Sequence, residues 1–513
     1  RFNNILKESE YMNGLFYEYF YNGSGVAVGD FNNDGWQDIY FVSTISKNKL
    51  YINNKNLNFI DVTIQAKADS GVGFDSGVTT VDINQDGLLD IYICRTGRFE
   101  KEDPRRNVLL VNKGIKNGIP QFEEMADTYG LDSPAFSTQA GFFDYDNDGD
   151  LDMFLINHGI DTYPESKIVE LKKITSKYRG ERLFRNDKGY FKDVTEDAGI
   201  VNNMLGYGLG LGFGDLNNDG WADIYISNDF SGQDHLYINN QNGSFKEVAK
   251  KTTKHISNFS MGNDIADFNN DGWLDVIAVD MMSEDNYGIK TSMGSMDPAR
   301  FYRHVDAGLH HQYMFNTLQL NNGVDPKSKL PKFSDIAQLI GVSSTDWSWA
   351  PLFIDMDNDG DKDLFISNGI KRDFRNNDFV NYRSKKEAAL MSGDVNVKKT
   401  FVIDLLNKMP SKKKYNYFYK NDNALSFSKM EVTQPETNSN GAAYADFDND
   451  GDIDLVVNNS DDPAYIYENK TNEINTNFYV KFEFKGPENN KNAIGTRVKL
   501  YQGDNQQLQE HYI

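Results

Sequence analysis

The stretch GDFNNDGWQDIYF, residues 29–41, places three aspartates and two asparagines in one short turn and then continues as an apolar segment. The nonapeptide within it has the pattern D-x-[DN]-x-D-G-x-x-D, with an amide at position 4 and glycine at position 6. The pattern recurs along the chain, so an internal repeat dominates the sequence. The seven copies, here called loops 1 to 7, occupy residues 30–38, 82–90, 144–152, 215–223, 267–275, 355–363 and 446–454.

The spacing of oxygen-bearing side chains predicts a cation site in each loop. Side chains at positions 1, 3 and 5 of a tight turn converge on one point, and the glycine permits the turn. A backbone carbonyl at position 7 and the Asp at position 9 complete an oxygen-only shell, which suits Ca²⁺ better than Mg²⁺, zinc or copper. We therefore expect up to seven Ca²⁺ ions. The predicted ligands are Asp30, Asn32, Asp34, Trp36, Asp38, Asp82, Asn84, Asp86, Leu88, Asp90, Asp144, Asp146, Asp148, Asp150, Asp152, Asp215, Asn217, Asp219, Trp221, Asp223, Asp267, Asn269, Asp271, Trp273, Asp275, Asp355, Asp357, Asp359, Asp361, Asp363, Asp446, Asp448, Asp450, Asp452 and Asp454.

Two other kinds of loop share part of this pattern. An EF-hand needs a Glu at position 12 and helices on both sides. Position 12 is apolar in every copy, as at Phe41 and Val457, and positions 10 to 12 have the composition of buried strands. The other alternative is a set of hydrated turns, because Asn, Asp and Gly favour turns without any metal. Crowding three to five carboxylates into each loop argues against it, since like charges repel.

A second signature follows each loop and extends the repeat. Its clearest forms are KLYINNKNLNFIDVT (49–63) and HLYINNQNGSFKEV (235–248), and NYFYKN (416–421) is a weaker one. Each unit thus consists of a strand, the acidic loop, a second strand, a turn, a third strand, an Asn/Gly turn and a fourth strand. Seven such units predict an all-β fold, a seven-bladed β-propeller over residues 1–469. The N-terminal RFNN is expected to complete the last blade and close the ring.

The units differ in length because of insertions between their second and third strands. Only 12 residues separate Asp38 from Leu50, whereas 43 separate Asp275 from Leu318 and 55 separate Asp363 from Phe418. In a propeller these connections lie on the face opposite the acidic loops. We therefore expect partly helical insertions on one face and the cations on the other, with function on the insertion face.

Composition narrows the class of protein. The formal net charge of −23 makes nucleic acid and anionic membrane surfaces poor partners, and no apolar run approaches the length of a membrane span. Aromatic residues make up 13% of the chain, which argues against disorder. The single cysteine, Cys94, lies in an apolar strand pattern and is predicted to be a core thiol. The chain starts at Arg1, so any targeting signal is out of view.

The seven loops, the LYxN strands and the segment 260–282 resemble the FG-GAP/VCBS-repeat family, calcium-binding propellers related to integrin α-subunit heads and to cartilage acidic protein. Residues 470–513 resemble the start of an ASPIC/UnbV module. The resemblance implies an exported protein, with a bacterial cell-surface or outer-membrane lipoprotein as the expected setting and a TonB-dependent uptake complex as a possible partner. Weak calcium sites, with dissociation constants on the order of 10⁻⁴ to 10⁻³ M in extracellular modules, also favour an extracytoplasmic location.

Candidate ligand-binding residues are those expected where the strands meet the insertion face. They are Asn157, His158, Asn228, Asp229, Trp347, Trp349 and Asn368. A funnel of this composition suits a glycan or a peptide; the alternative is that the tryptophans pack between blades and the amides cap strand ends. No catalytic motif is recognised, so we expect a non-enzymatic binding protein, with a polysaccharide lyase on a calcium-loaded propeller as the alternative.

Overall fold

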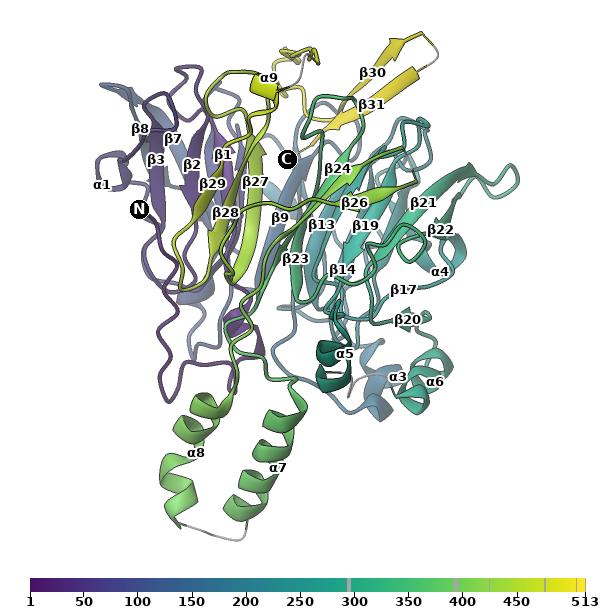
Figure 1. Cartoon of the computed structure of the whole chain (residues 1–513). Helices are drawn as coiled ribbons and strands as arrows, with labels where there is room; N and C mark the ends of the chain where they lie inside the picture. Colours follow the sequence, from purple (N-terminus) through teal and green to yellow (C-terminus); the bar gives the residue numbers. More distant parts are fainter. Residues whose placement is uncertain (293–296, 392–394, 424, 475–476, 504, 513) are drawn as a thin grey trace.

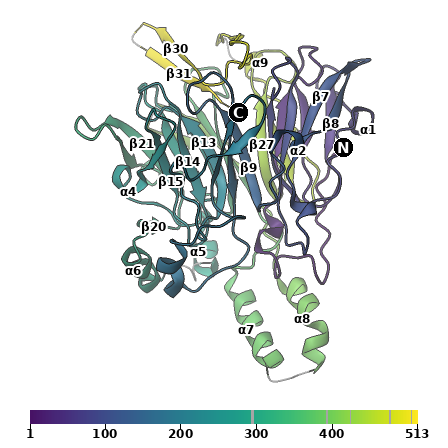
Figure 2. The ribbon, with the colours of Figure 1, turned by 180° about the vertical axis from the view of Figure 1, so that it is seen from behind.

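Seven β-sheets surround a central axis in a computed structural model of the whole chain (Figure 1), and the view from behind shows the same ring (Figure 2). The structure describes residues 1–292, 297–391, 395–423, 425–474, 477–503 and 505–512. Each sheet holds one acidic loop between its first two strands. The seven-bladed propeller predicted from the repeat is therefore confirmed.

The first four blades are four-stranded antiparallel meanders, in which consecutive strands are hydrogen-bonded neighbours. Blade 1 contains β1 (Val26–Gly29), β2 (Asp38–Phe41), β3 (Lys49–Asn53) and β4 (Phe59–Asp61). Blade 2 contains β5 (Asp75–Val81), β6 (Asp90–Arg95), β7 (Val108–Lys116) and β8 (Ile119–Glu124). Blade 3 contains β9 (Ser137–Phe143), β10 (Asp152–Asn157), β11 (Arg182–Asn186) and β12 (Phe191–Asp193). Blade 4 contains β13 (Gly208–Gly214), β14 (Asp223–Asn228), β15 (His235–Asn239) and β16 (Phe245–Glu247).

The remaining blades follow the same plan, with one strand fewer in the last. Blade 5 contains β18 (Gly262–Ala266), β19 (Asp275–Val279), β21 (Thr317–Val324) and β22 (Pro331–Asp335). Blade 6 contains β23 (Ser348–Ile354), β24 (Asp363–Asn368), β25 (Tyr417–Asn421) and β26 (Phe427–Lys429). Blade 7 has three strands among the described residues, β27 (Ser439–Ala445), β28 (Asp454–Asn459) and β29 (Tyr465–Tyr467).

The blades pack face to face, which explains why the second strands are so apolar. The second strands β2, β6 and β10 are buried at every position because blades cover both of their faces. Separate apolar clusters fill the spaces between blades, such as the one around Phe142 and Met153 between blades 2 and 3. Cys94 belongs to this cluster, so its predicted core position is confirmed.

The first strand of every blade lines the central axis and contacts the first strands of both neighbouring blades, including β1 with β27. Small residues are needed where these strands converge. A Cβ on Gly262 would lie only 2.0 Å from the backbone oxygen of Trp349 in the next blade. Because β1 of blade 1 contacts β27 of blade 7, the ring closes by direct contact between these two blades.

The insertions gather at one end of the ring, the lower end in Figure 1. Between β10 and β11 lie η3 (Glu165–Lys167) and α3 (Ile168–Leu171). Between β19 and β21 lie α5 (Asn286–Ser292), α6 (Pro298–Asp306) and β20 (Gln312–Tyr313), which pairs with β17 (Ile256–Ser257). Between β24 and β25, α7 (Asn377–Met391) and α8 (Val395–Lys408) form a helical hairpin that projects from the ring. The expected placement of the long insertions on one face is confirmed by this arrangement.

The remaining helices are single turns in connections between or beside blades. They are η1 (Glu18–Tyr21), α1 (Thr63–Ala66), η2 (Asp103–Arg105), α2 (Ala126–Tyr129), α4 (Ala249–Thr252) and α9 (Thr471–Ile474).

The N-terminal segment takes a different place from the one expected. Asn3 and Asn4 make isolated bridges to Pro463 and Ser460, just ahead of β29, instead of adding a strand to blade 7. The chain then crosses the insertion face, where Tyr17 and the η1 residues Tyr19, Phe20 and Tyr21 are buried in the largest apolar cluster. These aromatic side chains close the axis at the insertion end, which the repeat pattern did not indicate.

The C-terminal segment closes the opposite end. The hairpin of β30 (Thr496–Gln502) and β31 (Asn505–His511) lies at the upper end of the ring in Figure 1, on the face that carries the acidic loops. Residues 508–512 line the same axial cavity, of about 480 Å³, as the innermost strands. Leu508 packs against Leu216 and Leu274, so the hairpin is anchored by apolar contacts.

Candidate functional site

Each acidic loop closes a β-hairpin, and its own backbone folds around the first aspartate. In loop 1, Gly29 pairs with Asp38, so the first eight residues of the nonapeptide are the whole connection between β1 and β2 and the ninth begins β2. The Oδ1 atom of Asp30 accepts from the N–H of Asp34 at 3.0 Å, and its Oδ2 atom accepts from Gly35 at 2.7 Å. The position-4 residue, Asn33, has a φ of 53°, a left-handed conformation that asparagine tolerates better than most residues. The loop is thus held in shape by hydrogen bonds to Asp30.

The position-4 amide also links neighbouring loops. The side-chain amide of Asn33 donates to the backbone oxygen of Gly87 in loop 2 at 3.0 Å, and that of Asn449 donates from loop 7 to Gly35 at 3.1 Å. Asn218, Asn270 and Asn358 make the same contact to the following loop. In these five loops the position-4 amide satisfies both the left-handed backbone and the contact between blades, whereas Gln85 of loop 2 donates to the backbone oxygen of Asp82 in its own loop.

The position-9 aspartate has a structural task besides any metal contact. The Oδ1 atom of Asp38 accepts from the backbone N–H of Asn53 in β3 at 2.8 Å, and its Oδ2 atom accepts from Phe31 at 3.0 Å. The Oδ1 contact recurs in the other six blades, where the backbone N–H of an asparagine donates to the position-9 aspartate. The pairs are Asn112 with Asp90, Asn186 with Asp152, Asn239 with Asp223, Asn321 with Asp275, Asn421 with Asp363 and Asn469 with Asp454. This carboxylate therefore ties the loop to the third strand of its own blade.

The asparagine in that contact also reaches the preceding blade. The side chain of Asn53 donates to the backbone oxygen of Phe447 in loop 7 at 2.8 Å, and that of Asn112 donates to Phe31 in loop 1 at 3.0 Å. Asn239, Asn321, Asn421 and Asn469 make the same contact. The Asn of the LYxN strands is thus a residue between blades, a role that our sequence interpretation missed although the signal recurs in every unit.

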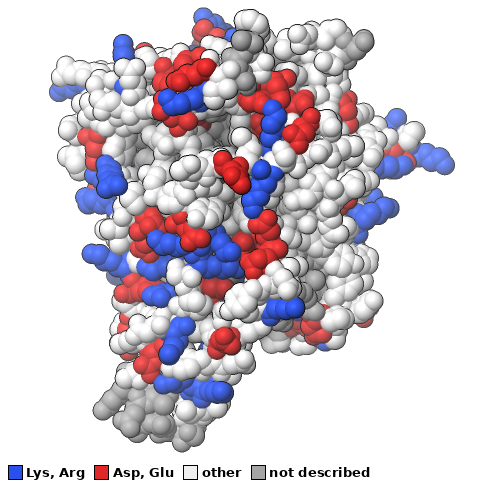
Figure 3. All heavy atoms as spheres, in the orientation of Figure 1, with Lys and Arg blue, Asp and Glu red and all other residues white. Residues whose placement is uncertain are grey.

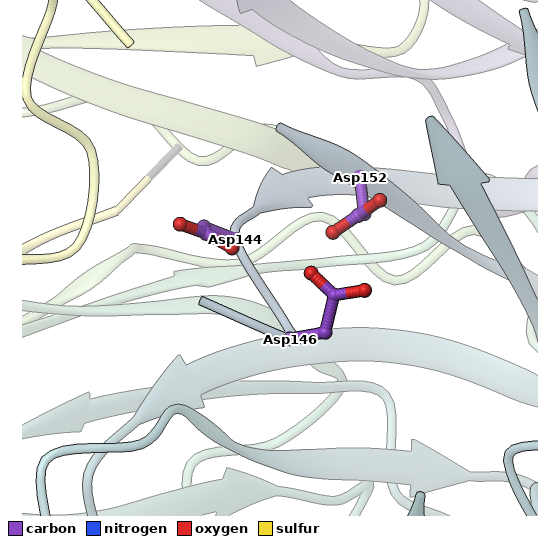
Figure 4. Close-up of side chains that lie close together, drawn as sticks. All are labelled: Asp144, Asp146 and Asp152. Carbon is purple, nitrogen blue, oxygen red and sulfur yellow. The ribbon is translucent and has the colours of Figure 1, made fainter. Parts of the chain in front are cut away.

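The loops with Asp at position 3 gather enough carboxylates to hold a cation. Ligand atoms of Asp144, Asp146 and Asp152 lie within 4.8 Å of one another in loop 3. Figure 4 shows the carboxylates of Asp146 and Asp152 facing each other, with Asp144 beside them. The same spacing occurs in loop 6 for Asp355, Asp357 and Asp359, and in loop 7 for Asp446, Asp448 and Asp450. Loops 1, 2, 4 and 5 carry Asn at position 3, so their donor sets are mixed amide and carboxylate.

Oxygen atoms left without hydrogen bonds provide the test of whether a cation fits. The Oδ1 atoms of Asp146 and Asp150 in loop 3 are buried and have no hydrogen-bond partner among the described residues. The same holds for Oδ1 of Asp355 and Asp357 in loop 6 and of Asp452 in loop 7. Buried carboxylate oxygens without donors are costly unless a cation compensates them. The hard oxygen donors at these loops therefore fit a divalent cation.

The charge balance of loop 3 supports the same conclusion. Burial raises the pKa of Asp152 to about 9, although the N–H of Asn186 opposes the shift and the charge of Asp146 adds to it. Burial and the charge of Asp148 raise the pKa of Asp150 to about 7. Ionising these groups together is unfavourable without a nearby positive charge, which a bound cation supplies.

Several loops already contact basic side chains of the protein, most closely loops 6 and 4. The Nζ atom of Lys420 in β25 contacts Oδ2 of Asp357 and lies 3.3 Å from Oδ2 of Asp359 in loop 6. In loop 4, Arg497 of the C-terminal hairpin lies 2.8 Å from Oδ2 of Asp215. Figure 3 shows Lys and Arg side chains beside acidic groups toward the upper end of the molecule, where the loops lie. The seven loops are thus not electrostatically equivalent.

On the insertion face, most of the predicted ligand-binding residues use their side chains for hydrogen bonds to the backbone of neighbouring segments. The amide of Asn157 donates to Gly180 and its oxygen accepts from Ser137, while Oδ1 of Asn228 accepts from the N–H of Tyr207. The side-chain amide of Asn368 donates to the backbone oxygen of Tyr415 at 3.3 Å. These three asparagines are buried and connect strand ends to neighbouring loops.

The other predicted residues divide between the core and a pocket. His158 is buried against Tyr17, and the indole N–H of Trp349 donates to the backbone oxygen of Gly369 at 2.8 Å. Asp229 and Trp347 instead line a pocket of about 360 Å³ in the insertion face. The structure therefore brings two of the seven predicted residues together at one cavity.

The pocket also contains residues that the sequence interpretation did not single out. Tyr19 comes from the N-terminal segment, Phe259 from the connection ahead of β18, Arg300 from α6, and Phe374 and Arg375 from the segment ahead of α7. They belong to non-repeating segments of the chain, so the repeat pattern provided no signal for them.

The fold and the acidic loops define the class of protein: the chain is a seven-bladed β-propeller with an acidic loop in every blade, and two of its segments are similar to FG-GAP-like repeats. A family model described as FG-GAP-like repeat matches residues 21–93 and 215–278. Cartilage acidic protein 1 of Mus musculus is 22% identical over 450 residues, 86% of this chain and 58% of that protein. Cartilage acidic protein 1 of Xenopus tropicalis is 27% identical over 212 residues, 40% of this chain and 28% of that protein. The chain spans less than two thirds of the length of these relatives.

A solved structure with a partial likeness is that of the V. cholerae biofilm matrix protein Bap1. It is 12% identical to this chain with a TM-score of 0.29, and the match covers 55% of this chain and 38% of that structure's chain. Among the described residues, no helix has the length and apolar character needed to cross a membrane.

Proposed function

We propose that this protein is a calcium-stabilised binding protein without catalytic activity that acts outside the cytoplasm. The separation of its two faces carries the proposal: the acidic loops lie at one end of the ring, and the long insertions with a pocket lie at the other. A rigid scaffold that presents elaborated loops on one face is a common basis for recognition.

Calcium is the cation that best suits the acidic loops. In loop 3, Asp144, Asp146, Asp148, Asp150 and Asp152 would hold it, and the other loops would use the corresponding positions. A bound ion supplies the positive charge that the crowded carboxylates need, and because it binds the folded loop it stabilises the ring. Sites of modest affinity are filled at the millimolar calcium levels outside cells, which supports an extracytoplasmic setting.

The proposed ligand is a protein partner, or a glycan or peptide, bound on the insertion face. The proposed setting is a bacterial cell surface, where a lipid anchor would hold the protein and a TonB-dependent uptake complex or an adhesion system would be its partner. This setting is supported by the resemblance of the repeats and of residues 470–513 to exported members of the family.

Matched surface variants test where the partner binds. Tyr287 on α5 and Tyr302 on α6 are 74% and 65% exposed on the insertion face, and Tyr501 on the C-terminal hairpin is 65% exposed at the other end. A partner captured from envelope extracts by the full-length wild type, in calcium, should be lost with the double variant Tyr287→Ala/Tyr302→Ala and kept with Tyr501→Ala. Loss only with Tyr501→Ala would contradict the assignment of the binding face. Turnover of a uronate polysaccharide in an absorbance assay would contradict the absence of catalysis.

A further inference from the structure

The pocket in the insertion face contains a half-buried arginine, Arg375, with an incomplete set of hydrogen-bond partners. The guanidinium of Arg375 lies 5.3 Å from the ring centre of Trp347 and 5.9 Å from that of Phe259, so two aromatic rings flank it. Its Nη2 atom donates to the backbone oxygen of Ser292 at 3.2 Å. Its Nη1 atom is buried and has no hydrogen-bond partner among the described residues. A guanidinium presents paired donors suited to a carboxylate, and here one side of that fork is free.

No carboxylate of the described residues lies within salt-bridge distance of Arg375, although three are in its neighbourhood. Asp229, Asp280 and Asp373 act on it only through space. Asp280 is already occupied, since it accepts from the hydroxyl of Ser257 and from the N–H of Phe259 and of Met281. Arg300, the other arginine of the pocket, is paired with Glu165 at 3.1 Å. Arg375 is therefore the one basic side chain of the pocket lining without an ion pair in the part of the chain that the structure describes.

The rest of the lining combines aromatic and apolar side chains with polar ones, among them Glu18, Asn22, Asp229 and Asn377. The carboxylate of Asp229 accepts from the hydroxyl of Tyr19 and from the N–H of Phe230. Tyr19, Phe230, Phe259, Trp347 and Phe374 surround the cavity, and Trp347 packs edge-on against Phe374 with ring centres 5.5 Å apart. The indole N–H of Trp347 is buried and likewise has no partner among the described residues. A cavity of about 360 Å³ is in the range of small-molecule sites, in which apolar walls hold the body of a ligand and a few polar groups orient it.

We propose that this pocket binds a small organic acid, whose carboxylate pairs with Arg375 and whose flat apolar body lies among Phe259, Trp347 and Phe374. We assign a carboxylate to the ligand because the Nη1 atom of Arg375 has a free donor and its guanidinium has no ion pair within the described part of the chain. An anion that hydrogen-bonds to such a cation stabilises it. The aromatic walls account for the apolar body. This goes beyond the binding role proposed above, because it assigns a ligand class to one cavity and requires neither calcium nor a macromolecular partner.

Calorimetric titration of the full chain with 3-phenylpropionate tests the proposal. The acid should bind at least about tenfold more tightly than 3-phenylpropionamide, its neutral isostere, because only the acid makes a charge-assisted hydrogen bond. Arg375→Met should lower the affinity for the acid by about tenfold or more and leave that for the amide unchanged. Arg98→Met is the matched control, because Arg98 is exposed at the same end of the ring and lies outside the pocket lining.

A second variant distinguishes loss of ligand binding from loss of folding, in case Arg375→Met fails to fold. Val380 lies at the pocket and is 42% exposed, so Val380→Trp should occlude the cavity and abolish binding while the melting temperature stays unchanged. A hexapeptide ending in phenylalanine that binds more tightly than 3-phenylpropionate would identify a peptide C-terminus as the source of the carboxylate, which still supports the pocket assignment. Equal binding of acid and amide, or no binding of acid and peptide, would overturn the proposal without affecting capture of a partner on the surrounding face.

Discussion

Asn53 contacts Asp38 in the first blade and Phe447 in the last blade, so it connects the two. Its backbone N–H donates to Oδ1 of Asp38 at 2.8 Å, and its side-chain amide donates to the backbone oxygen of Phe447 at 2.8 Å. One residue thus joins a loop to its own blade and to the blade before it. Because β1 and β27 also pack together there, this contact lies where the ring closes.

Asn53→Ala should destabilise the protein because it leaves the buried oxygen of Phe447 without a donor. The expected loss in the free energy of unfolding is about 1–3 kcal/mol, measured by chemical denaturation in calcium. Asn54→Ala is the matched control, since Asn54 is exposed and next in sequence. Equal stability of the two variants would show that the contact between blades contributes nothing measurable.

Removal of calcium should lower the melting temperature, because an ion that binds only the folded form stabilises it. At a calcium concentration 100 times the dissociation constant, each filled site contributes about 2.7 kcal/mol. Thermal unfolding in excess calcium and in EDTA measures the effect, with magnesium as the control ion. The double variant Asp146→Asn/Asp150→Asn should reduce the difference, and an unchanged melt in EDTA would count against filled loops.

Loops 3, 6 and 7 are expected to bind calcium more tightly than the others, because they have Asp at position 3 and an additional Asp at position 7. Titrating Asp146→Asn, which weakens loop 3, and Asn32→Asp, which adds a carboxylate to loop 1, tests this order. No difference in affinity between either variant and the wild type would contradict it.

Loop 6 differs from loops 3 and 7 because Lys420 lies close to two of its carboxylates, whereas in loop 7 Lys481 lies 3.9 Å from Asp446 alone. The ammonium of Lys420 contacts Asp357 and Asp359, so it competes with a cation for the same oxygens. Lys420→Met should raise the calcium affinity of loop 6 by about fivefold, corresponding to about 1 kcal/mol for a partly exposed charge. The gain should disappear in Lys420→Met/Asp357→Asn, and Lys246→Met, at an exposed position of β16, should have no effect. A lower affinity in Lys420→Met would show that the lysine shapes the loop instead of competing.

His158 should make the protein less stable at mildly acidic pH. Its Nδ1–H faces the backbone oxygen of Gly159, its Nε2 lies 2.7 Å from the hydroxyl of Tyr17, and Thr96, Tyr19 and the cation of Arg179 are the other polar or charged groups around it. Burial lowers the pKa of His158 to about 3, so the folded form stays neutral while the unfolded chain takes up a proton below pH 6.5. Stability is therefore lost as the pH falls from about 6.5 towards 3, by about 2 kcal/mol at pH 5.

Urea denaturation at pH 7.5 and pH 5, in a fixed excess of calcium, measures this contribution. His158→Gln keeps hydrogen-bonding capacity but cannot titrate, so it should lose about 2 kcal/mol less stability between these pH values than the wild type. The comparison between variants removes the contribution of the loop carboxylates, which titrate in both proteins. Equal losses would mean that His158 is protonated in the folded form.

The sequence by itself determined the repeated part of this protein. The spacing of Asp, Asn and Gly in each nonapeptide specifies a tight turn, and the apolar residues on both sides of it specify buried strands, so blade number, strand order and the opposite placement of loops and insertions followed. These features depend on interactions within about a dozen residues. They could be predicted from the sequence because the same local pattern occurs seven times.

Only the tertiary structure decided what lies at the two ends of the axis and how the blades are joined. The aromatic N-terminal segment, the docking of Arg497 onto Asp215 and the pocket around Arg375 bring together residues that are far apart in the chain and occur once. The Asn of the LYxN strands did recur in the sequence, yet the partner of its side chain, such as Phe31 for Asn112, lies in the preceding blade. Such contacts depend on how whole strands and segments pack, so the spacing of residues within a short stretch of sequence does not predict them.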